Sequence, residues 1–156
     1  MTFLFAALFA ALMAGCTGQD QTRAVQNSAV ADSTSPAAAV AWIRSYYAAI
    51  NEHRYDDAYA HWEQSGQASG KTLDEFRNGF GETENVQLTV GSTGTIGAAA
   101  GSRYIEIPVR IDARDKSGAE QTFAGTYTLR LSVVDGATPE QRSWHIYSAA
   151  IHRESP

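Results

Sequence analysis

The stretch Tyr104-Ile105-Glu106-Ile107-Pro108-Val109-Arg110-Ile111-Asp112 decides the fold that we expect for this chain. Its apolar and polar side chains alternate, so every second side chain lies on the same face of an extended strand. The segment TYTLRLSV at 126–133 repeats this alternation, and Asp115-Lys116-Ser117-Gly118 between them is typical of a turn. The two segments are therefore predicted to pair as an antiparallel hairpin with one apolar face.

Further strands are predicted on both sides of this hairpin. Val86, Leu88 and Val90 alternate with polar residues, and a last strand is expected from about Arg142 to Arg153. Glycines are frequent at 91–101, which predicts a flexible or bulged strand end there. The second half of the chain is thus expected to contain four strands.

Three amphipathic helices are predicted before the strands. Ser35 followed by Pro36 is typical of a helix start, and Thr72 with Glu75 forms a capping-box pattern. Apolar residues then recur at helical spacing: Ile43, Tyr46, Tyr47 and Ile50 in the first helix, Tyr55, Ala58, Tyr59 and Trp62 in the second, and Leu73, Phe76 and Phe80 in the third.

Helices followed by strands indicate an α+β fold. Because each middle strand has a single apolar face, we expect N-terminal helices packed on one side of a curved four-stranded antiparallel sheet.

The first 35 residues resemble a targeting segment and not part of the folded core. Residues 1–15 are uncharged and end in small residues, as a cleavable signal does, and 17–35 are polar and small, as in a flexible tether. Leu12-Met13-Ala14-Gly15-Cys16 resembles the lipobox of bacterial lipoproteins. That resemblance implies cleavage before Cys16, a lipid anchor on its thiol and, because Thr17 is not Asp, an outer-membrane lipoprotein facing the periplasm. The alternative is an ordinary buried helix followed by a small apolar cysteine.

The expected organisation is therefore a signal peptide at 1–15, a lipidated cysteine and tether at 16–35, and one domain at 36–156. That domain resembles the NTF2-like (cystatin-like, cone-shaped) superfamily. The resemblance is carried by Trp42-Ile43-Arg44-Ser45-Tyr46-Tyr47-Ala48-Ala49-Ile50-Asn51, by Tyr55-Asp56-Asp57-Ala58-Tyr59 and by Ser143-Trp144-His145-Ile146. Members include isomerases, dehydratases, transport factors, secretion components and many non-enzymatic domains, so the resemblance does not specify one activity.

Composition excludes several classes of function. The net charge of −5 and the pI near 5.3 argue against a nucleic-acid partner, which needs a basic face. One cysteine permits neither an internal disulfide nor a thiolate metal cage. The four histidines, at 53, 61, 145 and 152, show no chelating spacing, because on a regular strand residues 145 and 152 face opposite sides. No metal and no cofactor are expected.

Aromatic residues predicted to converge on the concave side suggest a pocket for a small apolar ligand, although the same side chains could fill it: Tyr46, Tyr59, Trp62, Tyr127 and Trp144. Tyr46 corresponds to the tyrosine donor of ketosteroid isomerases by the same resemblance. No acid is found at 64–70, where that family's base would lie. A catalytic set is therefore not predicted.

The opposite sheet face is expected to carry Tyr104, Glu106, Arg110, Thr128 and Arg130, as a surface for a second copy, an envelope protein or solvent. The favoured hypothesis is a lipid-anchored periplasmic domain that binds a partner and is not catalytic. Two alternatives stay open: a small isomerase or dehydratase with an aromatic-lined pocket, and an accessory component of a secretion or conjugation apparatus.

Overall fold

The computed structural model describes residues 32–155. The predicted signal peptide, Cys16 and the tether up to residue 31 lie outside the described residues. Within 32–155, helices come first and strands follow, which confirms the α+β prediction. None of the helices in this range is long and apolar enough to cross a membrane.

Three α-helices begin near the predicted positions: α2 (Pro36–Asn51), α3 (Tyr55–Ala60) and α4 (Leu73–Gly79), with a short 3-10 helix η1 (Gln67–Ser69) before α4. The Ser35 hydroxyl accepts a hydrogen bond from the backbone N–H of Ala38 at 3.2 Å, and so caps α2. The capping box of α4 is complete, because Thr72 accepts from the Glu75 N–H and the Glu75 carboxylate accepts from the Thr72 N–H.

The strands form one antiparallel sheet: β1 (Thr83–Val90), β2 (Gly97–Ala99), β3 (Ser102–Asp115), β4 (Glu120–Ser132) and β5 (His145–Arg153). Their order is β1-β3-β4-β5, and β2 also pairs with β3. The predicted count of four is thus too low. β3 is longer than β1, and β2 pairs with the part of β3 that β1 does not reach, at residues 102–104.

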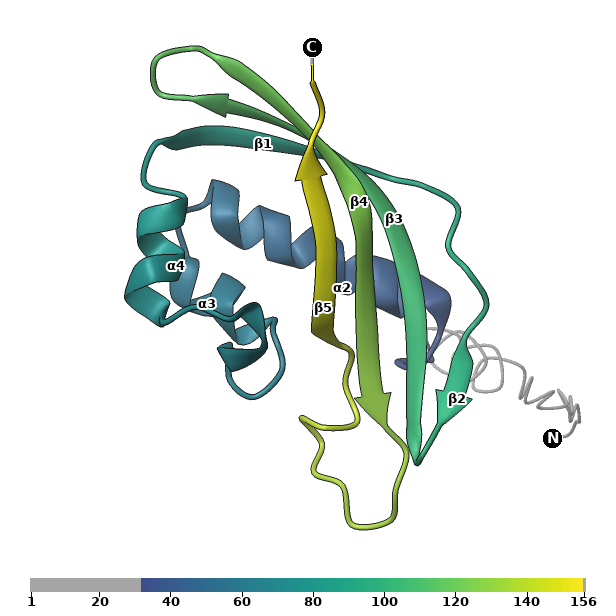
Figure 1. Cartoon of the computed structure of the whole chain (residues 1–156). Coiled ribbons are helices and arrows are strands. Elements are labelled where there is room, and N and C mark those ends of the chain that lie inside the picture. The colour runs from purple at the N-terminus through teal and green to yellow at the C-terminus, as the bar shows by residue number, and fades with distance from the viewer. Residues whose placement is uncertain (1–31, 156) are drawn as a thin grey trace, which may run out of the picture. The chain divides into compact units, whose positions relative to one another are not determined.

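The core lies between the helices and one face of the sheet. Ile107 pairs with Tyr127 and Ile105 with Leu129, and all four are at most 4% exposed. Figure 1 shows the long strands β3 and β4 bending along their length, with α2 lying across one face of the sheet. Val133, which continues the apolar alternation of β4, is 42% exposed because the strand ends at Ser132.

Two details of β5 differ from the prediction. The strand begins at His145, and its register against β4 shifts at Tyr147, which leaves that residue without a partner. This bulge removes the regular period by which His145 and His152 were expected to face opposite sides. Trp62 lies beyond the end of α3 and instead forms a parallel bridge with Ile146, at the free edge of β5.

Candidate functional site

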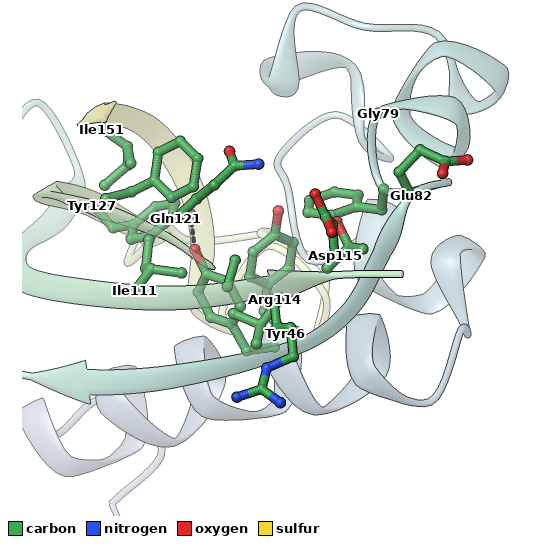
Figure 2. Close-up of a pocket in the computed structure, with 15 residues that line it drawn as sticks. Tyr46, Gly79, Glu82, Ile111, Arg114, Asp115, Gln121, Tyr127 and Ile151 are labelled. Carbon is green, nitrogen blue, oxygen red and sulfur yellow. Dashed lines mark hydrogen bonds between the residues drawn. The ribbon is translucent and has the colours of Figure 1, made fainter. Parts of the chain in front are cut away.

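A cavity of about 360 Å³ opens between the helices and the sheet, and we call it the tyrosine cavity. Its walls come from α2, from the end of α4 and the turn after it, and from β1, β3, β4 and β5. In Figure 2, Tyr46 lies below the centre of the opening, with Tyr127, Gln121 and Ile151 on one side and Glu82 and Asp115 on the other.

Three tyrosines meet at this cavity. The hydroxyls of Tyr47 and Tyr127 are 2.7 Å apart and share a hydrogen bond, drawn as the dashed line in Figure 2. The Tyr46 ring contacts both of the other rings edge to face, with centroid distances of 4.9 Å to Tyr47 and 6.2 Å to Tyr127. Tyr46 and Tyr47 are consecutive residues of α2, and the Tyr127 ring on β4 contacts both of their rings.

Burial is the largest cause that raises the pKa of all three phenols above the ordinary tyrosine value. The second cause that raises each pKa is electrostatic repulsion between the phenolate and a neighbouring tyrosine in its ionised form. The three hydroxyls are therefore neutral at physiological pH. They can donate and accept hydrogen bonds, but none of them supplies a phenolate base.

The two carboxylates in the described lining lie near the opening. Glu82 is an exposed residue. Asp115 accepts hydrogen bonds from the N–H and hydroxyl of Ser117 and from the N–H of Ala119, and these bonds lower its pKa. Its role is to hold the turn between β3 and β4, and neither acid is a buried carboxylate inside the cavity, where a general base would have to lie.

Of the five predicted pocket residues, Tyr46 and Tyr127 line the cavity. Trp62 and Trp144 are 9% and 2% exposed and belong to the core. Tyr59 turns away: its hydroxyl donates to the carbonyl of Lys71 at 2.7 Å, and its ring occupies the space where a Cβ on Gly66 would lie.

Six residues line the cavity that the sequence pattern did not indicate as pocket residues: Tyr47, Phe80, Val86, Ile111, Phe123 and Ile151. Tyr47 was recognisable, because it shares the apolar helix face with Tyr46. The others look like ordinary core residues in the sequence. Only the packing of the helices across the sheet leaves space beside them.

The predicted partner face divides into two groups. Tyr104 lies opposite Arg130, and Glu106 lies opposite Thr128 on the neighbouring strand. Arg110 is farther along β3, opposite Ala124, where it forms ion pairs with Glu154 and with Asp112. These surface pairs contribute little stability.

The histidines do not assemble into a metal site in the part of the chain that the structure describes. His61 joins two helices: its Nδ1 is 2.7 Å from the Asp57 carbonyl oxygen and its Nε2 is 2.7 Å from the Ser45 hydroxyl. Burial is the main cause that lowers its pKa.

A comparison with protein-family models, curated proteins and solved structures finds no match to this chain. The assignment of a function therefore depends on the chain's own residues. They provide a cavity lined by apolar side chains, by neutral phenolic hydroxyls and, at Glu82, Arg114, Asp115 and Gln121, by polar side chains, and the described residues place no buried acid in it.

Proposed function

We propose that this chain is a lipid-anchored binding domain of the bacterial envelope, which holds a small, mainly apolar molecule in the tyrosine cavity and acts by binding, not by catalysis. The observation that carries this proposal is the composition of the cavity. Apolar groups of Phe123, Ile111 and Ile151 form its walls, and hydroxyl groups are grouped at Tyr47 and Tyr127. Ligand sites commonly combine a predominantly apolar lining with a few polar groups that set the orientation.

The tyrosine pair indicates the polar part of the ligand. Two phenols carry two hydroxyl hydrogens, and the bond between Tyr47 and Tyr127 uses only one of them. The second hydrogen is available for an acceptor. A ligand with a carbonyl or ether oxygen on an otherwise apolar body would match this arrangement.

The isomerase or dehydratase alternative receives less support, since proton abstraction requires a base within reach of the substrate. Glu82 is exposed, and Asp115 is held in its own turn, where Oδ1 accepts from the backbone and hydroxyl donors of that turn. No observation favours the secretion or conjugation alternative over a binding domain.

The finer fold assignment, an NTF2-like domain, belongs to the same proposal. It is supported by helices that come before the sheet in sequence and cover one of its faces, and by the cavity between the two layers. The lipid anchor is supported by the sequence Leu12-Met13-Ala14-Gly15-Cys16. A tether of about 20 residues would allow the domain to reach at most roughly 65–70 Å from the bilayer, so a ligand or envelope partner would have to come to the membrane.

Cavity binding can be tested with Prodan, a neutral fluorophore with an apolar naphthalene body and a carbonyl acceptor. Prodan fluorescence should rise and shift to the blue with the full-length chain. Ile151→Trp, which places a larger ring in the cavity wall, should abolish this response, whereas the control Ile151→Val should keep it. An Ile151→Trp variant that folds and binds Prodan as well as the parent does would refute the proposal for this cavity.

The anchor is tested separately by the intact mass of the membrane-extracted chain. The parent should carry the additional mass of acyl chains and begin at Cys16, and Cys16→Ser should carry none. A parent chain without lipid would refute the anchor and leave the cavity proposal standing.

A further inference from the structure

A second cavity, of about 430 Å³, lies at the other end of the sheet, and we call it the polar groove. Ser102, which opens β3, lines the polar groove, and Asp115, which ends β3, lines the tyrosine cavity. The two linings share no residue, but they come close on β4, where Tyr127 of the cavity and Arg130 of the groove are three positions, or about 10 Å, apart. Side chains three positions apart on a strand point to opposite faces of the sheet, so the cavity and the groove are separate sites.

The described lining of the polar groove contains no aliphatic residue and no phenylalanine, tyrosine or tryptophan. Four hydroxyl side chains, two amides, two carboxylates, one guanidinium and one imidazole form it. Most of these groups offer both donors and acceptors. A concave surface of this kind matches a ligand that carries many hydrogen-bonding groups itself, and it matches an apolar ligand poorly.

An ion pair between the buried Glu63 and the half-buried Arg130 forms part of the groove lining. Glu63 is 9% exposed, and its Oε1 accepts a hydrogen bond from Arg130 Nε at 2.6 Å. The Glu63 backbone N–H donates to the Ile146 carbonyl at 3.0 Å, which holds the residue against the edge of β5. Among the described residues no side chain donates to the second carboxylate oxygen, Oε2, so a ligand hydroxyl can do so. Polar groups held in place before binding lose little conformational entropy when the ligand arrives.

An exposed aromatic ring lies beside this pair. Tyr147 is 44% exposed, and the Arg130 guanidinium carbon lies 5.1 Å from its ring centroid. Tyr104 contacts the same ring edge to face at 5.7 Å. The ring belongs to the bulged residue of β5, which has no partner on β4. Tyr147 lies outside the groove lining, but its ring contacts Arg130, which belongs to the lining, so the exposed part of the ring offers an apolar surface next to the groove.

The charge of the groove excludes two other classes of ligand. Two carboxylates outnumber one guanidinium, which disfavours a phosphate or another anion. No group of three potential metal ligands exists in the described residues, which argues against a metal ion. A neutral molecule with hydroxyls around its rim and an apolar face matches these groups best, because the groove offers both donors and acceptors.

We propose that the polar groove binds a neutral saccharide, with its hydroxyls on Glu63 and Arg130 and the C–H face of a sugar ring on Tyr147. A carboxylate that accepts from hydroxyls, a guanidinium that donates to them and an adjacent exposed aromatic ring together match the two kinds of surface on a pyranose. This site is separate from the tyrosine cavity, so either proposal can fail without the other.

The test is a ¹H–¹⁵N titration of the full-length chain in a zwitterionic, sugar-free detergent. Triacetylchitotriose, maltotriose and cellotriose are added separately, up to 20 mM. At least one should shift the amides of Glu63, Ser102 and Arg130 while leaving those around Tyr47 unchanged. No saturable shift with any of the three, or a shift confined to the tyrosine cavity, would overturn the proposal.

Variants at Tyr147 test the role of the ring while leaving Glu63 and Arg130 themselves unchanged. Tyr147→Ala should weaken the binding of the active saccharide at least tenfold, while Tyr147→Phe keeps the ring and should stay within about threefold of the parent. Gln67→Ala, at an exposed amide outside the groove lining, should have no effect and serves as the surface control. Equal affinities for the folded Ala and Phe variants would refute stacking on this ring.

Discussion

Gly125→Ala tests how closely β4 and β5 approach each other where the sheet forms a wall of the tyrosine cavity. Gly125 pairs with Ile151, a residue of the cavity lining. Its φ of +157° is one that residues with a side chain rarely adopt. A Cβ at this position would lie 2.0 Å from the Ala150 carbonyl oxygen and 2.9 Å from the Ile151 Cα.

The size of the effect follows from two costs. An ordinary carbon–oxygen contact is about 3.3 Å or longer, so the two strands would have to separate by more than about 1 Å. The unfavourable φ costs about 1–3 kcal/mol and the overpacking about 1–3 kcal/mol. We therefore expect a loss of about 4 kcal/mol, a large share of the roughly 5–15 kcal/mol that stabilises a domain. This corresponds to a fall in Tm of roughly 10–15 °C.

Thermal unfolding followed by circular dichroism measures this loss. Gly97→Ala is the matched control, since Gly97 is also a strand glycine and a Cβ there would have nothing within 4 Å. The control should change Tm by no more than about 2 °C. If Gly125→Ala unfolds within about 3 °C of the parent, the argument from close strand approach is wrong. Prodan binding by the variant would show whether the cavity wall has moved.

Three further predictions concern the helices and the buried hydroxyls. Tyr127→Phe and Tyr47→Phe should each lower the free energy of unfolding by about 1–2 kcal/mol, and the double variant should lose less than the sum in urea titrations, because the two hydroxyls share one bond. Thr72→Ala should cost about 1 kcal/mol in the same assay, because the capping box of α4 is lost; no change would show that the cap is dispensable. Stability should fall as pH drops through about 6.5, because burial lowers the pKa of His61 and only the unfolded chain then binds the proton freely. His61→Gln should reduce that slope, and an identical slope would exclude His61 as its cause.

Local patterns were sufficient for much of the fold. Ser35 followed by Pro36 predicted the start of α2, and Thr72 with Glu75 predicted the start of α4, because capping depends on neighbours in sequence. Alternation along 105–111 predicted a strand with one buried face, since side chains on a strand alternate with a period of two. These features need no knowledge of distant contacts.

Other features depended on residues far apart in the chain. β2 forms because β3 extends past the end of β1, which no local pattern in the glycine-rich segment indicates. The bulge at Tyr147 depends on the register of β5 against β4, and the exposure of Val133 depends on where β4 ends. Trp62 has helical spacing with Tyr59, yet it pairs with Ile146 at the sheet edge because tertiary packing overrides the local period.

The amino-acid sequence by itself determined the order of helices and strands, the face that each buries and the resemblance to a lipoprotein signal ending at Cys16, because each of these depends on neighbouring residues alone. The tertiary structure decided which aromatic side chains fill the core and which border a cavity, bringing Tyr47 and Tyr127 together and turning Tyr59 away. It also joined Glu63 to Arg130 across 67 positions. Such pairs depend on how the helices are packed against the sheet, and the local periodicity of the sequence does not predict that packing.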